Sequence, residues 1–437
     1  MKRIVIVGGG FAGVAAARRL ERRIPADWQL VLVSAENFML YTPLLPEVAG
    51  ASLLPGHSVA PLRSMLRRTR YYQAQVEEID LQQRIIRYRS RDLHELSFDH
   101  LVLACGKVAD IGIAAGMQEQ GLPLKTVGDA LHIRNQVINR LEEAELEKDP
   151  DVRRTLTSFI VVGGGTSGVE VAGAVADFMR AARKNYLRTR VLDTRVIVLE
   201  SGARLAHEFP AALGEAALKS MRNHGVEVHL NARVKSVSPQ GVKTESGDWF
   251  RGGNVICTIG TQPNPVLETF DLPTQKGLVS TGPDMSVAGL QGVWAIGDCA
   301  AVVNAHDGEP SPPTAQFAVR QGKQVADNIE RVIRGKSTRP FSYRPLGQLA
   351  SIGHRRAIAH VTGLQISGFP AWLLWRAVYL SMLPTFLRKL QVFSEWTLEL
   401  LFPRDTTQLH LQRTTAQPGA AESGQPAASP ASKAASG

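Results

Sequence analysis

Cysteine is scarce in this 437-residue chain, which contains only Cys105, Cys257 and Cys299, none of them in a C-x-x-C pair. Scattered cysteines argue against a disulfide framework and against a zinc site, so we predict a reducing compartment and no metal. Cys105 and Cys257 end apolar runs that predict buried strands, and Cys299 directly follows Asp298. We therefore interpret all three cysteines as structural rather than as a reactive pair.

A membrane-spanning segment and a secretion signal are also missing. The apolar segments are interrupted before they reach the roughly 20 residues that cross a bilayer. The chain enters its first apolar segment at Ile4, which leaves no room for a signal peptide. We expect a protein that lies in the cytosol or faces it.

The charge is unbalanced, with 50 Lys and Arg against 40 Asp and Glu and a net charge of +10. This excess favours anionic partners such as nucleic acid, an acidic substrate or an anionic membrane surface. Aromatic and basic residues do not alternate as they do in single-strand binders, so we predict no nucleic-acid partner. The length exceeds that of one ordinary core and predicts two or three domains.

A glycine motif follows the first apolar segment. Ile4–Val7 has the composition of a buried parallel strand. Gly8, Gly10 and Gly13 follow with the spacing G-x-G-x-x-G, ahead of a segment that predicts a helix. In a dinucleotide site the first glycine permits a tight turn, the second lets the backbone approach a pyrophosphate, and the third lets helix and strand pack closely. The alternative is a βα turn without a ligand.

The second strand of this unit is expected at Gln29–Val33. An acidic residue at the end of such a strand usually holds the ribose hydroxyls of the dinucleotide. Here the strand is followed by Ser34 and, two residues later, by Glu36, and the sequence leaves the choice between them open. The next segment, Asn37–Gly50, contains prolines that predict a rigid, extended loop lining a ring-shaped ligand, with an ordinary surface loop as the alternative.

The glycine motif returns at residues 159–170, where Gly163, Gly165 and Gly168 repeat the first spacing. Two copies in one chain predict two dinucleotide sites and therefore electron transfer between two cofactors. The following strand-like segment ends at Glu200, whose carboxylate can accept hydrogen bonds from both ribose hydroxyls and repels a 2′-phosphate. We therefore predict NADH rather than NADPH at the second site, although nearby Arg204 leaves some NADPH tolerance open.

Three further strand-like segments end at residues suited to a cofactor. Leu101–Gly106 and Asn254–Gly260 both end in glycine, and Val293–Asp298 ends in Gly-Asp. An aspartate in that position commonly contacts the ribityl chain of a flavin. The alternative for Asp298 is a turn residue that caps the next helix.

Two helices are predicted between these motifs. One extends over Gly121–Leu146 and is ended by Asp149-Pro150. The other continues through Arg331 and carries Gln316 and Arg320, which share one face because they are four residues apart. These two side chains could hold a carbonyl-bearing acceptor beside a flavin, or they could simply face solvent.

Residues 368–402 concentrate Trp, Leu and Phe, with Arg376, Pro384, Arg388 and Lys389 among them. Bulky apolar residues with basic neighbours suit helices that lie in a membrane interface. The alternative is a helical pair packed on the protein's own core or on the second copy of a homodimer. Residues 412–437, rich in Ala, Ser, Pro and Gly, are predicted to be disordered.

Together these motifs resemble those of the type II NADH:quinone oxidoreductases, a family of flavoproteins with two dinucleotide domains. The likeness extends over about residues 1–405 and is carried by Ala144-Glu145 and by residues 159–170, 295–300 and 313–318. It implies an α/β fold with two Rossmann-like dinucleotide-binding domains and a C-terminal amphipathic helical region. The expected ranges are 1–120 and 285–345 for the FAD-binding domain, 121–284 for the NADH-binding domain, 346–411 for a membrane-surface and quinone region, and 412–437 for the tail.

The resemblance also implies FAD and NADH as cofactors and hydride transfer from NADH to the flavin, followed by reduction of a membrane quinone without proton pumping. The place implied is peripheral, on the cytoplasmic face of the cell membrane, in a respiratory chain. Glu170 matches the family's glutamate near the NADH–flavin contact, and Gln316 matches the first glutamine of its quinone motif, whose second glutamine is replaced by Arg320. These three are the expected catalytic residues. The expected cofactor contacts are Gly8, Gly10, Phe11, Ala12, Gly13, Ser34, Glu36, Thr42, Pro43, Ala104, Gly106, Gly163, Gly165, Thr166, Gly168, Glu200, Gly260, Gly297, Asp298, Ala315 and Gln316.

Other functions stay open on the sequence. A soluble NAD(P)H-dependent flavoprotein reductase of a protein or small-molecule acceptor would not need the aromatic residues of the C-terminal region. A non-catalytic, redox-sensing flavoprotein would be reoxidised very slowly by every quinone. Sulfide:quinone oxidoreductases share the implied fold but need a reactive cysteine pair at the flavin.

Overall fold

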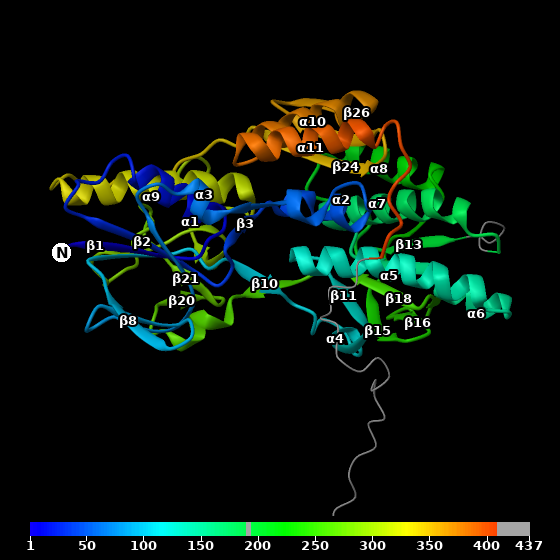
Figure 1. Ribbon diagram of the computed structural model, residues 1–437, viewed down its shortest axis with the longest axis horizontal. Helices are drawn as coiled ribbons and strands as arrows, with labels where there is room; N and C mark the ends of the chain where they lie inside the picture. The colour runs from blue at the N-terminus through cyan, green and yellow to red at the C-terminus, as the bar shows by residue number, and fades with distance from the viewer. Residues whose placement is uncertain (189–193, 409–437) are drawn as a thin grey trace, which may run out of the picture.

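Two parallel five-stranded sheets form the framework of the protein (Figure 1). The computed structural model describes residues 1–188 and 194–408. The strand order is β22-β9-β1-β2-β5 in the first sheet and β11-β18-β12-β13-β14 in the second. The first sheet comprises β1 (Arg3–Val7), β2 (Gln29–Ser34), β5 (Arg70–Gln73), β9 (His100–Leu103) and β22 (Val293–Ala295), and the second β11 (Gly121–Pro123), β12 (Ser158–Val162), β13 (Arg195–Leu199), β14 (Val226–His229) and β18 (Asn254–Cys257).

The two sheets are built alike around their central strands, β1 and β12. Apart from their first residues, Arg3 and Ser158, both strands consist of buried apolar residues, as parallel strands under helices require. Val7 pairs with Val33 and Val162 pairs with Leu199, so the residues after β2 and β13 reach the same point beside a glycine loop. The predicted α/β class with two Rossmann-like units is therefore confirmed.

Helices from distant parts of the chain cover these sheets. In the first half, α1 and α9 lie so close that a Cβ atom added at Gly322 would be 2.3 Å from the carbonyl oxygen of Ala12. Arg19 donates to Asp327 across this contact at 2.8 Å. In the second half α5, α7 and α8 contact the sheet. The helices named so far are α1 (Phe11–Leu20), α5 (Val127–Leu146), α7 (Thr166–Ala182), α8 (Ala211–Asn223) and α9 (Ala315–Ile333).

The chain crosses between the two halves at β10 (Lys107–Ala109) and β19 (Thr261–Pro263), which pair as antiparallel strands. Each crossing follows one of the two predicted strand-to-glycine endings, at Gly106 and Gly260.

Smaller helices, strands and turns complete the two halves. They are α3 (Leu62–Met65), α4 (Met117–Gln120), α6 (Pro150–Leu156), β4 (Val59–Pro61), β6 (Gln75–Asp80), β7 (Ile85–Arg89), β8 (Leu93–Ser97), β15 (Val234–Ser238), β16 (Gly241–Thr244), β17 (Trp249–Arg251), β20 (Thr274–Gln275), β21 (Leu278–Ser280), β23 (Ala300–Ala301) and the 3-10 turns η2 (Pro55–His57), η3 (Arg183–Asn185), η5 (Pro265–Thr269) and η6 (Gly297–Cys299).

The prediction of an extended loop over Asn37–Gly50 is wrong. The segment forms β3 (Phe38–Leu40), the turn η1 (Thr42–Leu44) and helix α2 (Leu45–Ala49). Pro43 and Pro46 each lie in the first two positions of a helical turn, where a missing backbone N–H costs nothing. The buried residues of α2 belong to the core of the second half, so this segment links the two halves.

The predicted helix over Gly121–Leu146 also needs correction at its start. Gly121–Pro123 is a strand, β11, at the edge of the second sheet, and helix α5 begins only at Val127. Thr126 and Asp129 form a capping box that fixes this start. The predicted end is confirmed, since α5 stops at Leu146 and Asp149 caps the following helix.

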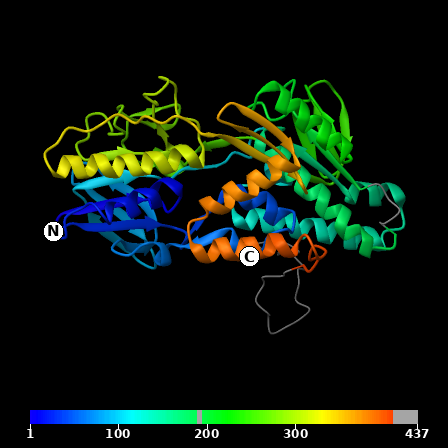
Figure 2. The same ribbon diagram turned by 90° about the horizontal axis from the view of Figure 1, so that it is seen from above.

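The C-terminal region forms a three-stranded sheet and two helices above α2 and α7 (Figure 1). Seen from above, α10 lies between the two halves and α11 runs along one long side of the molecule (Figure 2). Among the described residues, no helix is long and apolar enough to cross a membrane. The predicted disordered tail, 412–437, lies outside the described residues. The elements are β24 (Gly347–Gly353), β25 (Arg356–Val361), β26 (Leu364–Gly368), α10 (Phe369–Met382) and α11 (Phe386–Leu398).

The aromatic and apolar residues of this region divide into two groups. Trp372, Trp375 and Leu383 are at most 3 % exposed and pack into the core of the second half. Arg376 is partly buried and pairs with Glu399 at 2.7 Å. The membrane-interface prediction is therefore wrong for the three apolar residues, for which the alternative, packing on the protein's own core, is confirmed. The exposed apolar set consists of Phe369, Leu373, Met382, Phe386, Leu387, Leu390, Phe393, Leu398, Leu400, Leu401 and Phe402.

Candidate functional site

The first glycine loop joins β1 to α1 in the geometry that a dinucleotide needs. Gly8 has φ +115°, and a Cβ atom there would lie 2.2 Å from the carbonyl oxygen of Ala104. A Cβ atom at Gly13 would lie 2.0 Å from the carbonyl oxygen of Gly8. At Gly10, by contrast, a Cβ atom would meet no described atom within 4 Å. Backbone atoms therefore crowd Gly8 and Gly13, whereas the space at Gly10 is open. In dinucleotide-binding units a pyrophosphate approaches the backbone at this position, next to the start of the helix, which here is Phe11.

The second glycine loop repeats this construction between β12 and α7. Gly163 has φ +106°, and a Cβ atom at Gly168 would lie 1.9 Å from the carbonyl oxygen of Gly163. Thr166 is the first residue of α7, so its N–H points out of the helix N-terminus. The second loop differs from the first at its middle glycine. A Cβ atom added at Gly165 would lie 3.1 Å from a carboxylate oxygen of Glu208.

Ser34, the last residue of β2, and Glu200, the residue after β13, each lie beside their own glycine loop. Glu200 is 8 % exposed, and its Oε2 accepts from the backbone N–H of Gly164 at 2.5 Å. In the first half Ser34 occupies the matching position, since a Cβ atom at Gly9 would lie 2.8 Å from the Ser34 hydroxyl. Glu36 is exposed, two residues away. Of the two candidates left open by the sequence, Ser34 is the one beside the loop.

A cavity of about 100 Å³ lies at the end of β22, beside η6. Asp298 lines it, and burial raises the pKa of this carboxyl, opposed by Lys125 and Lys107. Gly297 donates its N–H to Oε1 of Gln321 at 2.7 Å. Gln321 is 2 % exposed and was not among the predicted residues, although its position four residues after the apolar Phe317 indicated a buried helix face.

Gln316 and Arg320 share one face of α9, as predicted, and Tyr343 lies between them. Gln316 accepts from the Tyr343 hydroxyl at 3.1 Å and donates to the carbonyl of Gly347 at 2.8 Å. The Arg320 guanidinium lies 5.0 Å from the centre of the Tyr343 ring. Tyr343 is distant in sequence from the motif, so no local signal could identify it.

Glu170 is buried on α7, one turn inside the helix that follows the second glycine loop. Its Oε1 accepts from the backbone N–H of Ser351 at 3.1 Å. Burial, with a smaller contribution from the charge of nearby Glu47, raises the pKa of Glu170 to about 8, although the hydrogen bond from Ser351 lowers it. This carboxyl therefore carries a proton at neutral pH.

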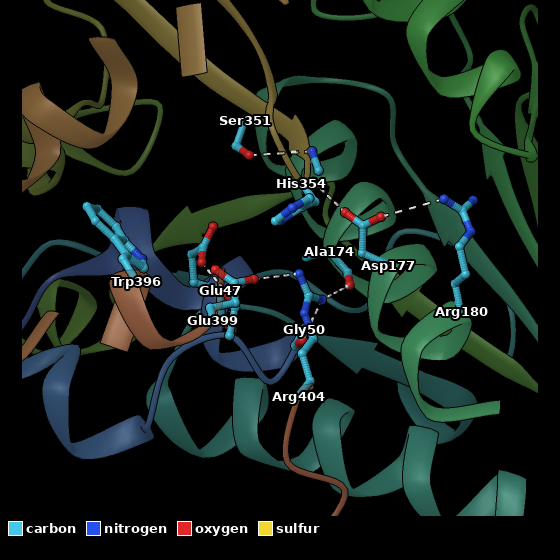
Figure 3. Close-up of polar contacts among 12 residues, drawn as sticks. Glu47, Gly50, Ala174, Asp177, Arg180, Ser351, His354, Trp396, Glu399 and Arg404 are labelled. Carbon is cyan, nitrogen blue, oxygen red and sulfur yellow. Dashed lines mark hydrogen bonds and ion pairs between the residues drawn. The ribbon is translucent and has the colours of Figure 1, made fainter. Parts of the chain in front are cut away.

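Further charged groups line the same small cavity as Glu170. Figure 3 shows Glu47, Glu399 and Arg404 among them. Glu399 accepts from Arg376 at 2.7 Å and from Arg404 at 2.9 Å. Arg404 also donates to the carbonyls of Gly50 and Ala174, at 2.8 and 3.1 Å. One arginine thus joins α2, α7 and the end of the C-terminal region. Burial raises the pKa of Glu47 at the same cavity, as does the charge of Glu399.

Asp177, also on α7, pairs with His224 at 2.6 Å. It also accepts from the backbone N–H of His354. The second half and the C-terminal sheet are therefore joined by hydrogen bonds as well as by apolar packing.

Aromatic side chains connect the first glycine loop with this cavity. Phe11 packs on Tyr41 with ring centres 5.7 Å apart, Tyr41 on Tyr379 at 6.3 Å, and Tyr379 on Trp375 at 4.8 Å. The Tyr41 hydroxyl is buried and has no hydrogen-bond partner among the described residues. Thr42 and Pro43 follow it in η1. A buried hydroxyl without a partner, next to an open glycine loop, fits a polar ring system such as a flavin.

The cysteines have no partner in a disulfide within the described residues. Cys257 is buried, which raises the pKa of its thiol. Cys299 is buried and donates to the carbonyl of Ile296 at 3.2 Å.

The two glycine loops, each at the carboxyl end of a parallel sheet, define an oxidoreductase with two dinucleotide-binding units. The model of the pyridine nucleotide-disulphide oxidoreductases matches residues 2–322, and that of the NDH2 C-terminal domain matches residues 346–405. The type II NADH:quinone oxidoreductase Ndh of Mycobacterium tuberculosis is 30% identical over 421 residues, covering 92% of this chain and 89% of that protein. The external alternative NADH-ubiquinone oxidoreductase of Yarrowia lipolytica is 26% identical, covering 92% and 80%.

Solved structures agree on the fold. NDH2 of Plasmodium falciparum in complex with NADH superposes with a TM-score of 0.86 at 18% identity, over 93% of this chain and 99% of that one. The sulfide:quinone oxidoreductase of Aquifex aeolicus gives a TM-score of 0.69 at 18% identity, over 95% and 100%. The chain belongs to the type II NADH:quinone oxidoreductases, within the pyridine nucleotide-disulphide oxidoreductases. The predicted activity class, a respiratory NADH dehydrogenase that does not pump protons, is thereby confirmed, and this family implies FAD.

Proposed function

We propose that FAD binds the first half of the protein and NADH the second. The open position at Gly10, the free Tyr41 hydroxyl and the Asp298 cavity support the first assignment. The contact of Glu200 with the second glycine loop supports the second. We keep the expected domain ranges, 1–120 with 285–345 for FAD and 121–284 for NADH. Bound FAD supplies the two-electron chemistry that joins NADH oxidation to quinone reduction.

Glu170 is proposed as the residue that provides a proton to the quinone. The overall reaction, NADH + H⁺ + quinone → NAD⁺ + quinol, takes one proton from the protein or solvent in each turnover. Glu170 carries a proton at neutral pH because it is buried, and it lies at the cavity between α7 and the C-terminal region. Gln316 and Arg320, joined through Tyr343, are proposed to orient the quinone carbonyl.

The exposed apolar residues of α10, α11 and the segment after α11 are proposed to lie in the surface of an anionic membrane, on its cytoplasmic face. Phe386 is 80% exposed and Leu401 73%. Arg388 and Lys389 lie two and three residues after Phe386 and can contact lipid headgroups. A quinone dissolved in the bilayer would then reach the site from the same side. The same apolar face would otherwise be covered by a second copy in a homodimer.

One experiment tests the central proposal. The purified protein should contain FAD by its absorbance spectrum, and NADH should bleach the flavin under anaerobic conditions. Addition of a quinone should then restore the oxidised spectrum within the time of turnover. Bleaching without reoxidation by any of several quinones would contradict quinone reduction and favour a redox sensor, while reoxidation only by a soluble acceptor would favour a soluble reductase.

A further inference from the structure

The two glycine loops differ in what lies above their middle glycine. A Cβ atom at Gly10 would meet no atom of the described residues within 4 Å, whereas one at Gly165 would lie 3.1 Å from Oε1 of Glu208. The same oxygen accepts from the backbone N–H of Thr166 at 3.4 Å. The second loop thus carries a carboxylate at the place where the first is open.

The backbone near Glu208 is fixed while its side chain is not. Ala206 donates its N–H to the carbonyl of Gly164 at 2.8 Å and has φ +46°, a conformation that residues other than glycine rarely adopt. This contact holds the loop between β13 and α8 against the glycine loop. The Glu208 side chain, in contrast, is 37% exposed, and within the described residues its one possible ion-pair partner is the His207 imidazole, 3.9 Å away. It can therefore swing toward solvent without disturbing the core.

The N-terminus of helix α7 attracts the Glu208 carboxylate. Helix α7 has no acidic residue in its first turn and no side-chain cap. Its first N–H groups and its dipole favour an anion, and Glu208 supplies one. A dinucleotide bound at the same loop brings a doubly charged pyrophosphate to the same helix end. The carboxylate and the pyrophosphate repel each other and cannot both occupy that position.

We propose that Glu208 takes the place of the pyrophosphate in the nucleotide-free protein and must be displaced for NADH to bind. The inference rests on the NADH site proposed above. It assigns Glu208 a function that differs from that of Glu200. Glu200 discriminates between NADH and NADPH at the 2′ position, whereas Glu208 weakens the binding of every ligand that carries a pyrophosphate.

The test measures binding of ADP-ribose, which contains the pyrophosphate but cannot react, to the FAD-loaded protein by calorimetry. Glu208→Gln removes the charge and keeps an oxygen that can accept from Thr166, and Glu208→Ala removes both. Both variants should bind ADP-ribose, NADH and NADPH about two- to fivefold more tightly, the range that one charge at a helix N-terminus produces. The control is Glu215→Gln, because Glu215 is an exposed glutamate on the neighbouring helix α8. The Glu215→Gln variant should bind ADP-ribose as tightly as the wild type.

Two results would overturn the proposal. Unchanged affinity in both Glu208 variants would mean that the carboxylate does not compete with the nucleotide. Weaker binding would mean that Glu208 holds the nucleotide instead. The NADH site is tested separately by Gly165→Val, in which the added side chain fills the pyrophosphate position. If that variant binds ADP-ribose like the wild type, the site assignment fails and the role of Glu208 fails with it.

Discussion

The Oε2 atom of Glu200 accepts a hydrogen bond from the backbone N–H of Gly164 at 2.5 Å, and Oε1 accepts from the N–H of Gly202 at 2.6 Å. The acidic residue of the second unit is therefore held against its glycine loop by the backbone itself. In the first unit the corresponding contact is between Ser34 and Gly9. The two halves share one construction, and they differ in the charge beside the ribose position.

This difference predicts the nucleotide preference. The wild type should use NADH better than NADPH, because the Glu200 carboxylate repels a 2′-phosphate. In Glu200→Ser the ratio of kcat/KM values for NADH and NADPH should fall about tenfold, which corresponds to roughly 1.4 kcal/mol. Glu215→Ser on α8 is the matched control and should leave the ratio unchanged. A wild type that prefers NADPH would contradict the role of Glu200.

The open space at Gly10 predicts the flavin site. Gly10→Val should place a branched side chain where the pyrophosphate of FAD approaches the backbone, so the purified variant should lose its flavin absorbance. Gly56→Val is a suitable control, because Gly56 is exposed and a Cβ atom there also meets nothing within 4 Å. Circular dichroism should show that both variants are folded. Full flavin content in a folded Gly10→Val protein would remove FAD from the first loop.

Local patterns in the sequence were sufficient for the two glycine loops and for Glu200. The reason is that strand, turn, helix and acidic residue follow one another within about 40 residues, at a spacing that the pyrophosphate and ribose dictate. Pro43 and Pro46 led to the wrong prediction of an extended loop, because proline disfavours a helix interior but is well tolerated in a first turn. Here each proline is the second residue of a helical turn.

Contacts between distant segments could not be predicted. Nothing near Arg404 in the sequence indicates that it binds Glu399, Gly50 and Ala174 together. Trp375 illustrates the same limit. Its apolar, basic surroundings suggested a membrane contact, yet it is 1 % exposed because α10 packs on the second core. Composition predicts that such a helix has an apolar face, but the fold determines what covers it.

The raised pKa of Glu170 predicts a pH dependence of quinone reduction. The carboxyl is neutral at pH 7 and ionises as the pH rises through about 8, after which it cannot provide a proton. Quinone reduction in the wild type should therefore fall above about pH 8. In Glu170→Gln the rate should be low and should lose this dependence, while anaerobic flavin reduction by NADH should change much less.

The free energy of unfolding should also depend on the ionisation of Glu170. The pKa of Glu170 in the folded protein lies above the unfolded value of 4.5, so its contribution is fully present below pH 4.5 and is lost as the pH rises through 8. Compared with Glu170→Gln, the wild type should therefore lose free energy of unfolding between these two pH values. Urea denaturation at pH 5, 7 and 9 measures the difference. A constant difference would show that the pKa of Glu170 in the folded protein is not raised above its unfolded value.

The last prediction concerns the exposed apolar residues of α11. Removal of the whole region after residue 365 is a poor test of membrane binding, because it would also remove Trp372 and Trp375 from the core. Phe386, Leu387 and Phe393 are 80, 59 and 55% exposed, so they can be changed without opening the core. Burial of one such side chain in the bilayer surface contributes up to about 1.5–3 kcal/mol. The triple change of these residues to Asp should therefore lower the affinity for anionic vesicles by about 100-fold or more.

Two controls separate membrane contact from other roles of these residues. Leu93→Asp changes a residue that is 51% exposed on β8, in the first half and distant from α11 (Figure 1), and it should leave vesicle binding intact. Reduction of a small soluble acceptor by NADH should be similar in the wild type and the triple variant, whereas reduction of a long-chain quinone in vesicles should fall with the binding. If the flavin-loaded triple variant binds vesicles like the wild type, this face does not contact the membrane. A loss of dimer mass in light scattering together with unchanged vesicle binding would instead identify it as the interface between two copies.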